Sequence, residues 1–285
     1  PKWQAGAHVD VVITPDKLRQ YSIVSDSSDR SQVQIAVLRE AGGRGGSVLL
    51  HRLFQKGRRV FVSRPINHFS LSPGAQYRYL MGGGIGITPM IAMAHELYAD
   101  GLPFELHYSV SRQRDGCFLT LLRSVAWADH VHIHISEKGS RLDLPKFFST
   151  SQANEHVYTC GPDAYMTAVQ EAAKAAGIPE EAIHFEYFAV PDVPDQENYP
   201  FTLVLRDGRR IPVGVDQSAA EAMIGAGVHV EIKCPDGLCG VCKCGVLAGE
   251  VDHRDHVLSV RDRNTHMITC QSRATVPEGE IAIDL

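Results

Sequence analysis

The chain has 285 residues, enough for two or three domains that each bury a core of their own. Its formal net charge of −5 argues against nucleic acid as the main partner, because such proteins carry a basic surface. No apolar run approaches the roughly 20 residues that span a bilayer, so no membrane partner is expected. Seven cysteines without the pattern of a disulfide scaffold predict a reducing, cytoplasmic location.

The first 75 residues predict a small antiparallel β-barrel. Short β segments, separated by turns rich in Ser, Asp and Gly, are expected at residues 7–13, 19–24, 32–38 and 59–63. A glycine-rich loop over 42–46 precedes an apolar helix expected over Val48–Phe54, with Ser47 as its N-cap. With the charge of Arg44, this loop predicts an anion site, although a loop without a ligand explains the pattern as well.

One strand of this segment carries a mixed set of side chains. By β periodicity, Arg19 and Tyr21 share one face of the strand and Ser22 points to the other. The spacing alone fits a solvated strand as well as a ligand site.

Residues 76–190 alternate strands with helices, which predicts a doubly wound parallel sheet. Strands are expected at 77–81, 104–110, 131–136 and 156–160, and helices at 90–99 and 163–176. The turn Gly82–Pro89 follows the first strand, with Thr88 expected as the helix N-cap and Pro89 as the first helical residue. Free N–H groups at this helix start suit a pyrophosphate, and the turn Cys160–Asp163 is expected at the same edge of the sheet.

Three histidines alternate on one predicted strand of this segment. His130, His132 and His134 suggest a metal site, but a polar strand edge is the favoured interpretation because carboxylates nearby in the sequence are few.

A proline-rich linker over residues 191–199 separates these segments from a third one at 200–285. In the third segment, strands at 201–205 and 211–215 flank Asp207-Gly208 and predict a hairpin, and a short helix is expected over Ser218–Gly225.

The strongest motif lies after that helix. Cysteines with the spacing C-x4-C-x2-C, followed by one far downstream, match the plant type of [2Fe–2S] ligand set: Cys234, Cys239, Cys242 and Cys270. Zinc is the alternative, but tetrahedral zinc sites usually combine two closely spaced ligand couples. Gly237, Gly240 and Gly245 are expected to let the loop wrap the cluster closely. Cys244 is interpreted as a small buried thiol rather than a ligand.

Taken together, the segments resemble the phthalate dioxygenase reductase family over essentially the whole chain. The matching motifs are Arg19-x-Tyr21-Ser22, Gly43–Ser47, Gly82–Pro89, Cys160-Gly161-Pro162, His184–Phe188 and the four cysteines. The resemblance implies a multidomain protein with a flavin barrel at 1–75, a nicotinamide nucleotide α/β domain at 76–190 and an α+β, β-grasp ferredoxin domain at 200–285. That family's barrel has one more strand before residue 6, so further residues upstream are expected.

The resemblance also implies roles for individual residues. The FMN phosphate would bind Arg19 and the turn Gly45-Gly46-Ser47, Tyr21 would pack on the flavin, and Ser22 would hydrogen-bond near its N5. Phe188 would cover the other flavin face and yield to the nicotinamide. Residues expected to bind the nicotinamide nucleotide are Gly83, Gly84, Gly86, Thr88, Pro89, Cys160, Gly161 and Pro162.

The cofactors follow from the same resemblance. FMN rather than FAD comes from the family, because the residues do not exclude an adenine site. NADH is the family's donor, while Arg112 and Arg114, in the loop after a predicted strand, keep NADPH as an alternative. Within the nucleotide set, Thr88 and Cys160 would line the nicotinamide pocket, and with Ser22 and Phe188 they form the expected catalytic set.

The implied function is electron transfer from NADH through FMN and a [2Fe–2S] cluster to a terminal oxygenase. This oxygenase would be a Rieske dioxygenase, a monooxygenase or an O-demethylase, and the reductase itself would be monomeric. Docking is expected around Pro235–Gly240, with Asp252 and Asp255. One alternative is the reductase half of a self-sufficient cytochrome P450. Another is a redox sensor or electron carrier without turnover, which Gly82–Pro89 and Phe188 argue against.

Overall fold

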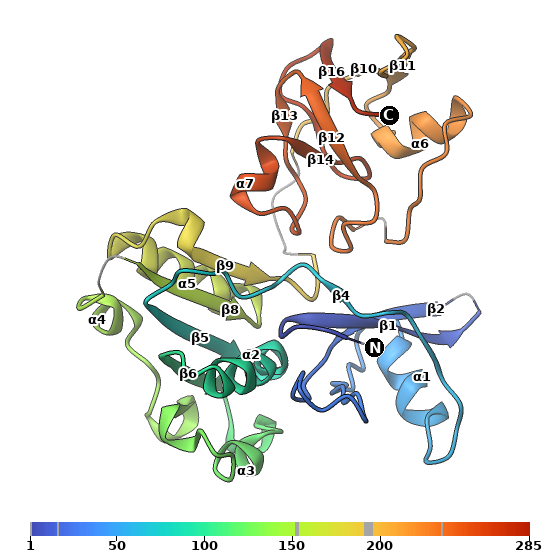
Figure 1. The fold of residues 1–285 in the computed structure, drawn as a ribbon. Helices are drawn as coiled ribbons and strands as arrows, with labels where there is room; N and C mark the ends of the chain where they lie inside the picture. Colours follow the sequence, from blue (N-terminus) through green and yellow to red (C-terminus); the bar gives the residue numbers. More distant parts are fainter. Residues whose placement is uncertain (1, 16, 152–153, 191–195, 235) are drawn as a thin grey trace. The chain divides into compact units, whose positions relative to one another are not determined.

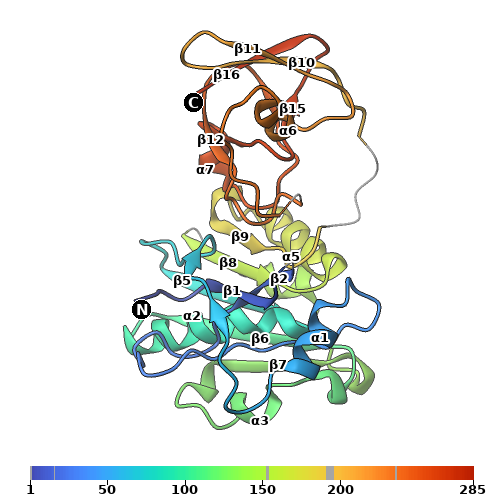
Figure 2. The ribbon, with the colours of Figure 1, turned by 90° about the vertical axis from the view of Figure 1, so that its right-hand side faces the viewer.

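A computed structural model describes residues 2–15, 17–151, 154–190, 196–234 and 236–285. Its contacts divide the chain into two compact units, Pro1–Phe185 and Glu186–Leu285, called the N-terminal and C-terminal units below (Figures 1 and 2). Residues 191–195 of the expected linker and Pro235 of the expected docking surface lie outside the described residues.

The N-terminal unit opens with an antiparallel sheet, as the sequence predicts. Its central strand β1 (Ala7–Thr14) pairs with β2 (Lys17–Ser22), β3 (Phe61–Val62) and β4 (Ile66–Asn67). The strand expected at 32–38 is wrong, since the segment forms only an isolated bridge between Ile23 and Ile35. Most of its side chains are exposed or half-buried, so a longer strand would bury little apolar surface.

Helix α1 (Gly46–Leu53) follows the glycine-rich loop. Ser47 is not its N-cap. Gly45 caps the helix with φ at 76°, a left-handed conformation that glycine adopts without steric cost. Ser47 lies in the first turn instead, where its Oγ accepts the backbone N–H of Glu40 at 3.0 Å.

The second sheet is the predicted parallel one (Figure 1). Its strands run in the order β7 (Val131–Ile135), β6 (Phe104–Val110), β5 (Tyr77–Gly83), β8 (Glu155–Cys160) and β9 (Ile183–Glu186). The pairs β5–β6, β5–β8 and β6–β7 are parallel. The short elements around it are η2 (Gln113–Asp115), α3 (Leu119–Leu122), η3 (Ala128–His130), η4 (Ser136–Lys138), α4 (Leu144–Phe148) and η5 (Glu180–Ala182).

Two helices cover opposite faces of this sheet, α2 (Ile87–Ala99) and α5 (Asp163–Ala175). Leu80 belongs to the core that contains α2, whereas its neighbour Met81 belongs to the core that contains α5. Successive residues of a strand point to opposite faces, so one strand supplies both cores. The sheet is therefore doubly wound, as predicted.

The start of α2 differs from the expectation. A 3₁₀ turn, η1 (Gly84–Gly86), runs directly into the helix, so Thr88 is its second residue rather than its N-cap. The Thr88 hydroxyl donates to the carbonyl of Ile85 at 3.0 Å.

The antiparallel sheet has a hydrophobic cluster of its own, but segments next to its strands pack against the parallel sheet. Ala5, Val24 and Phe69 pack in the same hydrophobic cluster as the buried face of α2. The backbone N–H of Ala5 also donates to the carboxylate of Glu96 on α2 at 2.8 Å. Residues 1–185 therefore form one unit, within which a boundary near residue 75 stays a prediction.

The C-terminal unit has a mixed sheet and a helix, α6 (Ala219–Gly225), packed on it. Its strand order is β11 (Arg210–Val213), β10 (Phe201–Val204), β16 (Gly279–Ile283), β12 (Lys243–Ala248) and β14 (His266–Ile268). The β10–β16 pair is parallel, and the other pairs of this sheet are antiparallel. The smaller elements are β13 (Val251–Asp252), α7 (Val260–Arg263) and β15 (Arg273–Ala274).

The predicted hairpin and helix are both confirmed. β10 and β11 pair around a turn that contains Gly208, and Ser218 caps α6 in a reciprocal capping box with Glu221. Throughout the described part of the chain, no helix is both long and apolar enough to cross a membrane.

Candidate iron–sulfur and nucleotide sites

The four predicted ligand cysteines carry reduced thiols in the C-terminal unit, and their sulfurs form two pairs. A hydrogen bond with Cys239 lowers the pKa of Cys234 to about 5, and one with Cys270 lowers the pKa of Cys242 to about 6. The backbone N–H of Cys239 also donates to the Cys234 sulfur at 3.3 Å. The sulfurs of Cys234 and Cys239 therefore form one pair, and those of Cys242 and Cys270 form the other.

This pairing distinguishes a two-iron cluster from zinc. Four thiolates on one tetrahedral zinc ion, each at 2.3 Å, would all lie about 3.8 Å from one another. Among the residues that the structure describes, no three cysteine sulfurs lie within 4.8 Å of each other. Two separate pairs suit two iron ions, each held by two thiolates, so the ligand set fits [2Fe–2S].

The loop that carries these cysteines depends on two glycines. Gly237 and Gly240 have φ values of 71° and 66°, in the left-handed region that other residues rarely adopt. A Cβ on Gly237 would also lie 2.7 Å from the side chain of Gln271. Gly245 does not belong to this wrapping, contrary to expectation. It lies in β12, where a Cβ would lie 3.1 Å from the Cβ of Asp284.

Cys244 is a buried thiol, as predicted. It packs in the core of the mixed sheet with Met267, whereas Cys242 packs in a different cluster with Leu258 and Ile268. Burial raises the pKa of Cys244 to about 11. The thiol is thus protonated at neutral pH and directed away from the ligand cysteines.

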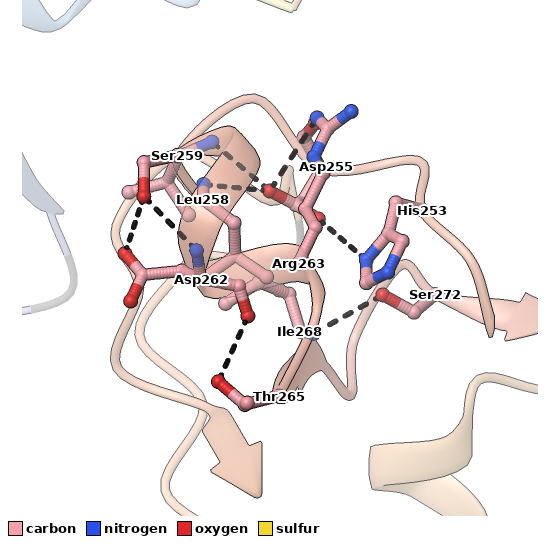
Figure 3. A network of polar contacts seen from close by, with 10 residues as sticks. His253, Asp255, Leu258, Ser259, Asp262, Arg263, Thr265, Ile268 and Ser272 are labelled. Carbon is pink, nitrogen blue, oxygen red and sulfur yellow. Dashed lines mark hydrogen bonds and ion pairs between the residues drawn. The ribbon is translucent and has the colours of Figure 1, made fainter. Parts of the chain in front are cut away.

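Asp255 lies beneath the cysteine loop rather than on a docking surface, which corrects the expectation. Its side chain is 1% exposed, and its Oδ2 accepts the backbone N–H groups of Val257 and Leu258 at 3.2 and 2.8 Å (Figure 3). Arg263 donates to its backbone carbonyl at 2.9 Å. The neighbouring N–H of His256 donates to the carbonyl of Gly237. The carboxylate is therefore an internal support of the loop.

In the N-terminal unit, the two glycine turns meet at the carboxyl ends of β5 and β8, as predicted. Gly82 pairs with Cys160 in the sheet. A Cβ on Gly86 would lie 2.2 Å from the carbonyl oxygen of Cys160, and one on Gly161 would lie 2.9 Å from the Cα of Gly83. Only glycines allow this approach, which leaves a narrow backbone cradle.

The side chains expected to line the nicotinamide pocket are covered. Thr88 is 2% exposed and Cys160 is fully buried, and Pro89 is buried as well. At this edge of the sheet, Gly84, Ile85 and Gly161 are half-buried and Pro162 is exposed. Gly161 and Pro162 carry the chain from β8 to the start of α5.

A hollow of about 630 Å³ lies beyond the ends of β6 and β7, lined by Arg112, Gln113, Arg114 and Glu137. The carboxylate of Glu137 accepts the backbone N–H of Gln113 at 2.7 Å. The sequence analysis singled out the two arginines but not Glu137. Glu137 follows the next strand, β7, and lies beside the arginines because β6 and β7 are neighbours in the sheet.

The expected flavin residues are partly assembled. Arg19 lies against the first turn of α1, because a Cβ on Gly46 would lie 2.8 Å from its Nε. Tyr21 is half-buried, and burial raises its pKa although Arg19 opposes this. Ser22 is 6% exposed, and Ser47 faces the Glu40 backbone. Phe188 is 44% exposed and belongs to the C-terminal unit, whereas the other flavin candidates belong to the N-terminal unit.

Comparisons with known proteins show the family of this chain. Residues 203–275 match the family described as 2Fe-2S iron-sulfur cluster binding domain. The phthalate dioxygenase reductase of Burkholderia cepacia is 37% identical over 289 residues, covering 100% of this chain and 88% of the relative. The solved structure of phthalate dioxygenase reductase aligns with a TM-score of 0.68, at 37% identity, over 100% of this chain and 89% of that chain.

A fused protein is also similar. The solved structure of an intact type IV self-sufficient cytochrome P450 monooxygenase aligns with a TM-score of 0.89 and 37% identity. The match covers 100% of this chain but 37% of that one, so the chain spans little more than a third of the fusion. The 37% identity over the whole chain and the paired thiols lead to one conclusion. The chain belongs to the phthalate dioxygenase reductase family and is an oxidoreductase that uses NADH, FMN and a [2Fe–2S] cluster.

Proposed function

We propose that this chain is the reductase that supplies single electrons from NADH to a terminal oxygenase. The observation that carries the proposal is the combination of a two-by-two thiol set with a nucleotide cradle in one chain. A simple electron carrier needs only the first of these. When bound, FMN would supply hydride-accepting chemistry and the cluster would supply single-electron transfer, which together would convert one kind of transfer into the other.

The flavin site is proposed to lie along β2 and α1. Arg19 and the N–H groups of Gly45, Gly46 and Ser47 would bind the phosphate, because a cation and free helix N–H groups both favour an anion. Tyr21 would pack on the flavin ring, and Ser22 would hydrogen-bond near its N5. The division into a flavin segment at 1–75 and a nucleotide segment at 76–190 belongs to this proposal.

The donor site is proposed at the meeting of β5 and β8. Backbone N–H groups of Gly83, Gly84 and Gly86 would hold the pyrophosphate, with Gly161 and Pro162 forming the opposite wall. Thr88 and Cys160 would border the nicotinamide, and Pro89 would fix the helix start. The hollow lined by Arg112 and Arg114 is proposed to lie beside the adenosine ribose, where two arginines would also accept the 2′-phosphate of NADPH.

A pair of cysteine substitutions tests the proposal in the full chain loaded with FMN and cluster. The wild type should reduce cytochrome c with NADH in the absence of air. Cys242→Ser should lose cytochrome c reduction by at least tenfold while retaining NADH–ferricyanide activity, since it removes a thiolate of one pair. Cys244→Ser, two residues away in the sheet core, should retain both activities. A loaded wild type that reduces no cytochrome c would refute the reductase proposal.

The partner is proposed to be a Rieske-type oxygenase met as a separate protein by a monomeric reductase. A haem oxygenase joined to the same polypeptide is the second candidate, favoured by the TM-score of 0.89 to the fused P450. Stopped-flow mixing of the reduced protein with a purified Rieske oxygenase or with a P450 haem domain discriminates between them. The true partner type should be reduced at least tenfold faster than the other.

A further inference from the structure

Four ionisable side chains gather on the parallel sheet and take no part in the sites described above. Glu105 and His107 lie on β6, His132 and His134 lie on the neighbouring strand β7, and the register pairs His107 with His132. Alternate residues of a strand face the same side, so all four point to one face of the sheet. The ring of Phe147, from α4, lies 4.6 Å from the His107 ring on this face.

Three polar contacts run in line through this cluster. His107 Nε2 lies 3.2 Å from Glu105 Oε2, and His107 Nδ1 lies 3.1 Å from His134 Nε2. His134 Nδ1 then lies 3.2 Å from the carbonyl oxygen of Ser140. The line thus has an acceptor at each end and two imidazoles between them.

The hydrogens do not suffice for these contacts. Two neutral imidazoles supply two N–H groups, and three contacts need three. When the Ser140 carbonyl and the His134 ring each receive one, the lone pair of His107 Nε2 faces the Glu105 carboxylate. In that tautomer, a proton or a cation between the two atoms would satisfy both. In the other tautomer, His107 donates to Glu105 and the contact with the Ser140 carbonyl lacks a hydrogen.

A third ligand atom lies beside this contact. His132 Nε2 is 4.0 Å from the same Glu105 oxygen, and one ligand atom from each of Glu105, His107 and His132 lies within 4.8 Å of the others. Around a zinc ion, such atoms would be about 3.3 Å apart. The His132 side chain is 46% exposed and can close this gap by rotating, whereas buried His107 stays in place.

Neighbouring hydrogen bonds orient the Glu105 carboxylate and the His107 ring, as they commonly orient metal ligands in proteins. The Tyr77 hydroxyl donates to Glu105 Oε1 at 3.1 Å, which leaves Oε2 for the other partner. Likewise, His134 holds His107 by its Nδ1 and leaves Nε2 free, the usual arrangement of a histidine ligand.

We propose that Glu105, His107 and His132 bind a zinc-type divalent cation, with the fourth coordination position open to water. Two imidazoles and a carboxylate form a donor set that zinc accepts readily, and three protein ligands leave one position free. The cation would bind between Glu105 Oε2 and the lone pair of His107 Nε2, and through His132 it would link the edge strand β7 to β6. It is an additional site on the nucleotide sheet and uses none of the proposed FMN, NADH or cluster ligands.

Calorimetric titration with zinc chloride tests this site in the full chain carrying FMN and cluster. The wild type should bind one zinc ion, and His132→Ala and Glu105→Gln should each weaken binding at least tenfold. His229→Ala is the matched control, an exposed histidine of the C-terminal unit whose loss should leave affinity unchanged. Zinc-edge X-ray absorption should show nitrogen and oxygen ligands at about 2.0–2.2 Å rather than sulfur at 2.3 Å.

Several results would overturn the proposal: no zinc binding by the wild type, equal binding by both site variants, or sulfur in the zinc shell. Retained NADH–ferricyanide activity identifies variants that are folded. If a site variant loses it, Tyr77→Phe replaces that variant, because this change removes only the hydrogen bond to Glu105. It should weaken zinc binding severalfold, and an unchanged affinity would count against the site.

Discussion

At the scale of single residues, Arg19 is the proposed anchor of the flavin phosphate. Its guanidinium lies against the first turn of α1, where Gly46 has no side chain to displace it. A hydrogen bond to a charged group contributes about 1.5–3 kcal/mol, so Arg19→Ala should weaken FMN binding by about tenfold to a hundredfold. Fluorescence of released FMN measures the dissociation constant. Arg44→Ala, in the exposed loop before the helix, should weaken FMN binding much less. Equal weakening by the two substitutions would contradict the assignment of Arg19 as the phosphate anchor.

Asp255 is predicted to act on stability rather than on docking. Asp255→Ala leaves the N–H groups of Val257 and Leu258 without their acceptor and Arg263 without a charged neighbour. Buried groups left without partners cost about 1–3 kcal/mol each, so the free energy of unfolding of the C-terminal unit should fall by at least that amount. Chemical denaturation followed through cluster absorbance measures it.

Asp252 supplies the comparison for that prediction. It is half-buried and pairs with Arg254 at 2.7 Å, near the surface. Such pairs contribute about 0–1 kcal/mol, so Asp252→Ala should be nearly neutral. Equal destabilisation by the two substitutions would contradict the internal role of Asp255.

At the scale of elements, the contact between η1 and the end of β8 is predicted to be decisive for the donor site. A Cβ on Gly86 would lie 2.2 Å from the Cys160 carbonyl oxygen, so Gly86→Ala must push two backbones apart. Overpacking of this kind costs about 1–3 kcal/mol. We expect a KM for NADH at least tenfold higher, together with a lower unfolding temperature. Gly214→Ala, where a Cβ meets no atom within 4 Å, should change neither quantity.

The elements also show what the sequence can predict. The strand expected at 104–110 is β6 with the same bounds, since its alternation and flanking breaks agree with the sheet. The helix starts were misplaced because Ser47 and Thr88 are good caps by type, while Gly45 and the turn η1 set the backbone.

Contacts between distant strands were beyond sequence reasoning. Few carboxylates lie near His132 along the chain, yet the register of β6 with β7 brings Glu105 and His107 beside it. Asp255 was expected on the surface because it is acidic, and only the packing of its loop buries it. The available signal for the proposed cation site was the spacing Glu-x-His on β6 opposite His-x-His on β7.

At the scale of the whole molecule, the N-terminal unit should respond to acid through His184. Burial, with a contribution from His156, lowers the pKa of His184 to about 4 from its usual value of 6.5. Below pH 6.5 the unfolded chain binds a proton that the folded chain does not bind until about pH 4. Stability is therefore fully present above pH 6.5 and is lost progressively as the pH falls to about 4.

His184→Phe isolates this effect, because it keeps an aromatic ring against Tyr158 and cannot titrate. At pH 5 the wild type should have lost about 2 kcal/mol from this source relative to pH 7. Chemical denaturation at both pH values should show the variant losing that much less. Equal losses in the two proteins would mean that another group causes the acid sensitivity.

The two units are predicted to unfold separately, because each has its own hydrophobic core within the described residues. On heating, the two units should therefore unfold at different temperatures. Loss of cluster absorbance reports unfolding of the C-terminal unit, and loss of NADH–ferricyanide activity reports unfolding of the N-terminal unit. Asp255→Ala should lower only the temperature at which cluster absorbance is lost. Lowering the pH should lower the temperature at which NADH–ferricyanide activity is lost more in the wild type than in His184→Phe, and the loss of cluster absorbance should show no such difference. If both signals move together under either change, the units are coupled and electron entry and exit form one cooperative structure.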